Sequence, residues 1–138
     1  MTRKARYLDL VQRHLKRERE LTDGISLVVL GKTEKRLGVR LPVSLREYYL
    51  CVGKLELLKL PHHKHYDHAE LRVEDGHLLF MEEKQRSVHW GIRVQDVAVD
   101  PEVWQRVRSK PPEWRSERLT FFNFILHLHD RQTGHGQA

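Results

Sequence analysis

The segment that most suggests site chemistry is a histidine-rich stretch near the middle of the chain. His62, His63, His65 and His68 lie close together there, with Asp67 between the last two. Imidazole and carboxylate groups are ligands for zinc or nickel, and several of them can converge in a flexible loop. No regular spacing on a rigid element supports such a site, which favours the alternative of a polar, pH-sensitive surface loop. We therefore expect no metal and no cofactor.

The acidic residues and the single cysteine offer little catalytic chemistry. Glu82 and Glu83 are adjacent at the end of an expected strand, so their side chains should point to opposite faces. Nothing brings Asp96 and Asp100 together, and we interpret both as turn or cap residues. Cys51 lies in an apolar helical pattern, whereas a catalytic thiol needs an electropositive and partly open setting. The common hydrolase, phosphate-loop, metalloprotease and paired-cysteine motifs are absent as well, so we expect no enzyme.

Large aromatic side chains are the second group of interest. Trp90, Trp104 and Trp114 lie in the C-terminal half, whereas Tyr48 and Tyr49 lie in an expected helix. Partly exposed aromatic residues near charged rims are typical hot spots of protein interfaces. The tryptophans are separated in sequence from the main basic segment, which argues against a nucleic-acid platform of interleaved aromatic and basic residues.

Composition and charge indicate a single domain. The 138 residues suit one domain, and the mixture of 39% hydrophobic with 32% charged residues is enough for a real core. Residues 1–40 contain eleven Lys/Arg against five Asp/Glu, whereas residues 41–138 contain fourteen of each. A basic segment raises encounter rates with acidic partners, RNA or anionic lipid, although a solvated helix face has the same composition.

Several features predict the cellular setting. No apolar run approaches the roughly 20 residues needed to cross a bilayer. The basic N-terminus has no apolar region behind it, so we do not expect a signal peptide. Cys51 is the only cysteine and cannot form an intramolecular disulfide, which makes the cytoplasm the default location.

Apolar periodicity and breaker residues predict the helices. The N-terminal helix is expected to bury Leu8, Val11 and Leu15, and residues 25–30 fit either a short strand or a buried helical turn. Asp100-Pro101 has the form of an N-cap followed by proline at the first helical position. The expected helices are 3–21, 33–37 with Thr33 as N-cap, 43–52, a short one through 103–104, and 117–129.

Strand signals concentrate in the middle of the chain. Asp75-Gly76 is a turn dipeptide of the kind that joins strands. In the segment 87–94, Val88, Trp90 and Ile92 alternate with polar residues or glycine, which predicts one buried face. The expected strands are 71–73, 77–82 and 87–94, with 95–99 as a further candidate and a long surface connection over 54–70. We expect one domain over 1–130 and a frayed tail over 131–138.

Five of these segments, taken in order, resemble the SUKH superfamily, a group of domains named for yeast cell-wall-synthesis regulators and abundant in bacteria. The resemblance covers roughly residues 34–126. Its segments are Leu37-Gly38-Val39-Arg40-Leu41-Pro42 with Leu45 to Gly53, Asp75 to Gln85, Trp90-Gly91-Ile92, Asp100 to Trp104, and Leu119 to Leu126.

The resemblance implies an α+β fold with helices packed against a mixed or antiparallel sheet. It also implies an immunity protein that binds and neutralises a cognate toxin, often a nuclease, without catalytic residues. The net charge of the chain is positive, whereas an inhibitor of a basic nuclease is expected to be acidic. Either the partner is acidic at its contact surface, or the more acidic segment 61–100 makes the contact. The expected partner-binding residues are Tyr48, Tyr49, Glu83, Gln85, Trp90 and Trp104.

Two other functions stay open. The basic N-terminal helix suits a regulatory or nucleic-acid-associated scaffold, which would bind RNA with a steep salt dependence. The histidine-rich stretch suits a small enzyme or metalloprotein.

Overall fold

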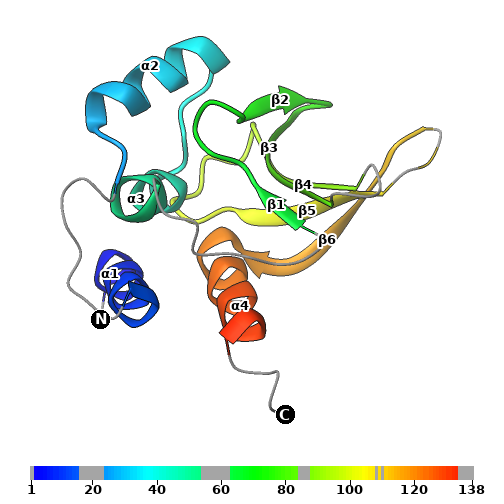
Figure 1. Cartoon of the computed structure of the whole chain (residues 1–138). Helices are drawn as coiled ribbons and strands as arrows, with labels where there is room; N and C mark the ends of the chain where they lie inside the picture. Colours follow the sequence, from blue (N-terminus) through cyan, green and yellow to red (C-terminus); the bar gives the residue numbers. More distant parts are fainter. Residues whose placement is uncertain are drawn as a thin grey trace.

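The computed structural model describes residues 2–15, 24–53, 63–83, 88–107, 109 and 111–133. Within these residues, four helices and one antiparallel sheet form a single α+β domain, as the sequence predicts (Figure 1). The helices are α1 (Arg3–Leu15), α2 (Leu27–Leu37), α3 (Val43–Val52) and α4 (Phe121–Thr133). The strands are β1 (His63–His65), β2 (Arg72–Glu74), β3 (His77–Glu83), β4 (His89–Arg93), β5 (Glu102–Val107) and β6 (Glu113–Thr120).

The sheet is built around β3. Its strands follow the order β1-β3-β4-β5-β6, and β2 pairs with β3 alongside β1. All the pairings are antiparallel, and a bulge interrupts the β3–β4 register between Leu79 and Met81. The β2–β3 turn is Asp75-Gly76, as predicted. Both residues have positive φ, 53° and 71°, as the mirror-image hairpin turns require.

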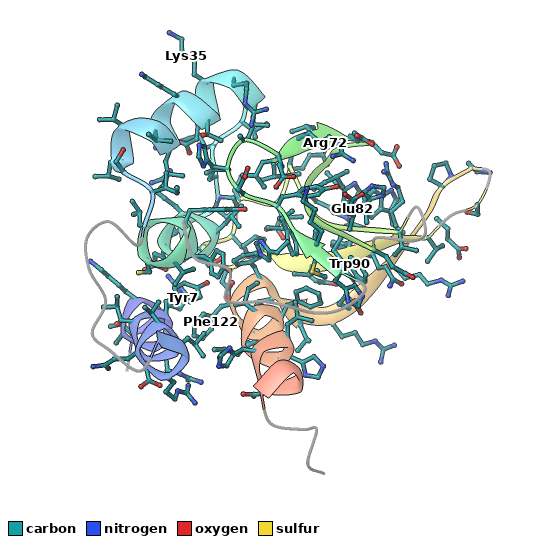
Figure 2. The ribbon with its side chains drawn as sticks, viewed as in Figure 1. Tyr7, Lys35, Arg72, Glu82, Trp90 and Phe122 are labelled. Atoms are coloured by element: carbon teal, nitrogen blue, oxygen red, sulfur yellow. The ribbon has the colours of Figure 1, made fainter. Side chains whose placement is uncertain are left out.

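The core lies between the sheet and the helices. Phe80 of β3 packs edge-to-face on Phe121 of α4, with ring centroids 5.1 Å apart. Tyr48 of α3 packs on Phe121 as well, so α3 and α4 cover the same face of the sheet. Helix α1 packs outside them, because the buried Tyr7 contacts Tyr48 and Phe122 (Figure 2).

Helix α1 confirms the predicted N-terminal helix over its described residues, but its buried stripe differs. Tyr7, Leu10 and Val11 are buried, whereas Leu8 is only partly buried. The Tyr7 hydroxyl donates to the Ser44 carbonyl oxygen at 3.0 Å, and Arg3 pairs with Glu47 at 2.8 Å. The basic helix is therefore fixed to the domain by one face.

Helix α2 corrects the prediction for residues 25–37. One helix runs through this segment, and Ser26 is its N-cap, since its hydroxyl accepts from the Val29 N–H. Thr33 is a buried residue inside the helix, where its hydroxyl donates to the Val29 carbonyl oxygen, so it is not a cap. Gly38 ends the helix with φ 73°, as predicted.

The C-terminal third corrects two further predictions. Residues 102–107 form strand β5 instead of a short helix, and the last helix begins at Phe121 because β6 continues to Thr120. Asp100 is nevertheless a helix cap. Its Oδ1 accepts from the Phe122 N–H at 2.9 Å, at the start of α4.

Other boundaries also shift. The expected connection over 54–70 contains strand β1, and Tyr66 just after it is 2% exposed. Residues 95–99 form no strand. Helix α4 continues to Thr133, into the predicted tail. Among the described residues, no helix is both long and apolar enough to cross a membrane.

Candidate interaction surface

The sheet has a second face, opposite α3 and α4, and pairing registers define its residues. Arg72, Leu79, Gly91, Trp104 and Ser116 are consecutive partners across β2, β3, β4, β5 and β6, so their side chains share one face. Because side chains alternate along strands, the neighbours two residues away lie there too. We call this surface the open face. The further members are Glu74, His77, His89, Arg93, Arg106 and Trp114. Glu82 belongs to the same face through its pairing with His89, because the β3 bulge shifts the alternation.

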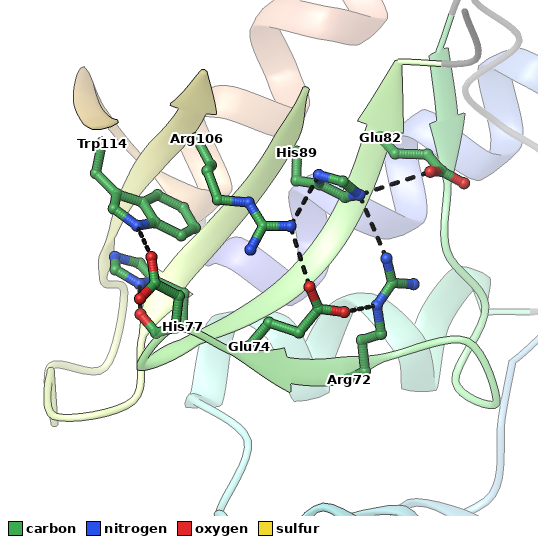
Figure 3. Close-up of polar contacts among 8 residues, drawn as sticks. Arg72, Glu74, His77, Glu82, His89, Arg106 and Trp114 are labelled. Carbon is green, nitrogen blue, oxygen red and sulfur yellow. Dashed lines mark hydrogen bonds and ion pairs between the residues drawn. The ribbon is translucent and has the colours of Figure 1, made fainter. Parts of the chain in front are cut away.

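Two arginines and a glutamate form the centre of this surface. Glu74 accepts from Arg72 Nε with one carboxylate oxygen and from Arg106 Nη2, at 3.1 Å, with the other (Figure 3). Burial alone would raise the pKa of Glu74, but the hydrogen bonds from Arg72 and Arg106 outweigh it and lower this pKa. Glu74 is therefore a carboxylate that holds two guanidinium groups side by side.

His89 lies between the same two arginines. Its Nδ1 is 3.0 Å from Arg106 Nη2, and its Nε2 is 3.3 Å from Arg72 Nη2. Glu82 Oε2 is 3.7 Å from Nε2, which is beyond hydrogen-bond distance. Burial, and then the positive charges of Arg106 and Arg72, lower the pKa of His89, so the imidazole is neutral at pH 7.

Tryptophans stack with cations and with histidine on the same face. The Arg93 guanidinium lies 3.8 Å from the ring centroid of Trp104. Trp114 stacks on His77 with centroids 3.5 Å apart, and its indole N–H donates to Asp75 Oδ2 at 2.6 Å (Figure 3). The positive-φ turn at Asp75 thus aligns a carboxylate with the edge of Trp114. Both tryptophans are partly exposed but held in defined positions.

The structure separates the predicted partner-binding residues. Tyr48 and Tyr49 are 4% and 1% exposed, and the Tyr49 hydroxyl donates to the Tyr66 carbonyl oxygen at 2.6 Å. Trp90 is 5% exposed on the helix-covered face, where its indole N–H donates to Glu117 at 2.7 Å. All three are core residues, which leaves almost no surface for a partner to contact.

The other predicted contacts have different positions. Trp104 lies on the open face, as described above. Glu83 is partly buried at the end of β3, and its N–H donates to the Val88 carbonyl oxygen at 2.9 Å. Gln85 lies outside the described residues.

Two of the histidine candidates for a metal site pack their rings against aromatic side chains. His63 lies edge-on to Trp90, with centroids 5.1 Å apart, and His65 contacts Tyr48 at 5.1 Å. The His68 carbonyl oxygen accepts from Arg36. His62 lies outside the described residues, and within the described ones no three His, Cys, Asp or Glu side chains form a group that could hold a metal ion.

Sequence reasoning missed Arg72, Arg93, Arg106 and the two histidines beside them. The alternation of His89, Gly91 and Arg93 with Trp90 and Ile92 was the available signal, since it places the polar set on one face. It did not show which residues of β2, β5 and β6 share that face. That information depends on register.

Family models, curated proteins and solved structures were each compared with this chain, and no match was found.

Proposed function

We propose that this chain is a non-enzymatic protein-binding domain of the SUKH immunity type, which neutralises a toxin in the cytoplasm. The open face carries the proposal. Its two partly exposed tryptophans are fixed by Arg93, His77 and Asp75. Tryptophan and arginine dominate interface hot spots, and side chains that are already ordered lose less entropy on binding. The resemblance of residues 34–126 to SUKH domains supports the immunity role.

Co-expression with the product of the adjacent upstream gene tests the proposal. We expect a complex that survives purification and relieves the growth arrest caused by that product. The absence of both complex and rescue would remove the immunity function.

Trp104→Ala tests whether the open face makes the contact. Truncating a central tryptophan should weaken the complex by about 2 kcal/mol or more. Leu27→Ala is the control, because Leu27 is a large apolar residue that is 68% exposed on α2. If Leu27→Ala weakens the complex and Trp104→Ala does not, the immunity function stands but the open face is the wrong surface.

A nucleic-acid-associated scaffold is the second candidate. Lys4, Arg6 and Arg13 are exposed on α1, where they form a basic surface separate from the open face. Titration with single-stranded RNA at several salt concentrations tests this candidate. A steep loss of affinity with salt favours it, and undetectable binding at low salt removes it.

A further inference from the structure

The two arginines that contact the ring of His89 bring more hydrogen-bond donors than the ring can accept. A guanidinium group has only N–H donors, whereas a neutral imidazole has one donor nitrogen and one acceptor nitrogen. Arg106 and Arg72 approach opposite nitrogens of the ring, at 3.0 Å and 3.3 Å. In either tautomer His89 accepts from one arginine and turns its own N–H toward the other.

Arg106 is the closer of the two arginines, so we assign the tautomer in which His89 Nδ1 accepts from Arg106. With Nδ1 accepting from Arg106, Nε2 carries the hydrogen and faces the Arg72 Nη2 donor. Glu82 Oε2 lies 3.7 Å from Nε2, which is too long for a hydrogen bond. The His89 N–H and the Arg72 Nη2 group therefore face each other, and the neighbouring side chains are the Glu82 carboxylate and the buried Tyr66 hydroxyl, which lies beside Arg72.

Charge and exposure favour an external acceptor there. Arg72 and Arg106 share the single carboxylate of Glu74, and among the described residues no carboxylate forms an ion pair with Arg93. Lys64, on the β1 side, is already paired with Glu70. The Arg72 side chain is 41% exposed, so an incoming group meets it first, whereas the His89 and Arg106 side chains are 10% and 15% exposed.

We propose that Arg72 Nη2 and His89 Nε2–H form a receptor for one carboxylate, supplied by an Asp or Glu side chain on the partner protein. The assignment of the carboxylate to a protein rests on the proposed function. A carboxylate can accept from both donors at once, and charge-assisted hydrogen bonds are the strong ones. Glu82 is then the internal competitor, which the incoming carboxylate displaces from His89.

An acetylated hexaglutamate peptide is the probe, followed by NMR of the Arg72 side-chain Nε–H and the His89 ring nitrogens. We expect both sets of signals to shift on titration. Arg72→Gln should weaken peptide binding by about tenfold or more, and Arg72→Lys should give an intermediate affinity, because lysine keeps the charge without the planar fork. Glu82→Gln should strengthen binding by about threefold, because it removes the competing charge.

Arg115→Gln is the matched control. Arg115 is exposed on β6, where its register with Gln105 places it on the other face of the sheet, and we expect its affinity within about twofold of the parent chain. Backbone amide spectra show whether each variant is folded.

Three outcomes would overturn the receptor. One is the absence of a shift at His89. Another is an equal loss of affinity in Arg72→Gln and Arg115→Gln, which indicates general charge attraction. The third is tighter binding of inorganic phosphate or single-stranded RNA than of the peptide at this site. None of these depends on the upstream gene product, so the receptor can fail while growth rescue succeeds, and the reverse.

Discussion

His65 is a partly buried base in an aromatic cluster. Its ring packs against Tyr48 and Phe80, its Nδ1 lies 3.1 Å from the Tyr66 carbonyl oxygen, and Nε2 is buried without a hydrogen bond. Burial lowers the pKa of His65 to about 4. Because this pKa is lowered on folding, the unfolded chain takes up the proton first, and stability is lost as pH falls from about 6.5 toward 4.

His65→Phe should therefore reduce the loss of unfolding free energy as the pH falls below about 6.5. Between pH 7.5 and pH 5, we expect the variant to lose about 2 kcal/mol less unfolding free energy than the parent chain. Urea unfolding at the two pH values measures the difference. His127→Phe, on the exposed side of α4, should keep the parent's pH dependence. An unchanged pH dependence in His65→Phe would show that His65 is free to take up a proton in the folded chain.

Gly91 and Gly31 form a matched pair for testing close packing. A Cβ at Gly91 would lie 2.9 Å from the Leu78 carbonyl oxygen and 3.1 Å from Leu79 Cδ2, whereas a Cβ at Gly31, in α2, would meet nothing within 4 Å. Gly91→Ala should destabilise the domain by about 1–3 kcal/mol. Gly31→Ala should stabilise it by about 0.5–1 kcal/mol, since alanine is the better helix former. Thermal unfolding checks both, and stabilisation by Gly91→Ala would mean that β3 and β4 can separate there.

At the scale of elements, Asp100 joins the loop before β5 to the start of α4. Its Oδ1 accepts from the Phe122 N–H, and the Pro101 carbonyl oxygen accepts from the Phe121 N–H at 2.8 Å. Asp100→Ala should cost about 1 kcal/mol of unfolding free energy, as lost helix caps do. Asp100→Asn keeps the oxygen acceptor and should recover most of that loss in urea unfolding. Equal losses in both variants would indicate that the negative charge, and not the hydrogen bond, stabilises α4.

Asp100 also shows where sequence reasoning reaches its limit. The prediction that Asp100 caps a short helix opening at Pro101 is wrong, because it caps α4, which begins at Phe121, and local sequence contains no sign of that contact. Helix α3, the Asp75-Gly76 turn and the β3–β4 pair were predictable because apolar spacing and turn chemistry are local. Strand β5 was not, since its order comes from pairing with β4 and β6. The open face depends on the same long-range register, so only its Trp104 was identified in advance.

At the scale of the whole molecule, charge is distributed over two separate surfaces. The net charge of +6 comes from the N-terminal segment, and α1 exposes Lys4, Arg6 and Arg13 while its other side is buried against α3 and α4. The open face carries the ordered arginines. Long-range charge affects mainly association rates, whereas contacts inside an interface affect mainly dissociation. The two surfaces should therefore be separable by kinetics.

The triple variant Lys4→Gln, Arg6→Gln, Arg13→Gln tests this separation in the complex with the proposed partner. At low salt we expect about threefold slower association with nearly unchanged dissociation, because an attractive field is weakened while the contact stays intact. At about 0.5 M salt the difference should disappear, since screening shortens the Debye length well below 10 Å.

Arg72→Gln should show the opposite pattern, with faster dissociation at both salt concentrations. Surface plasmon resonance resolves the two rates. Faster dissociation in the triple variant would place α1 inside the interface, and unchanged rates in Arg72→Gln would remove the open face from it.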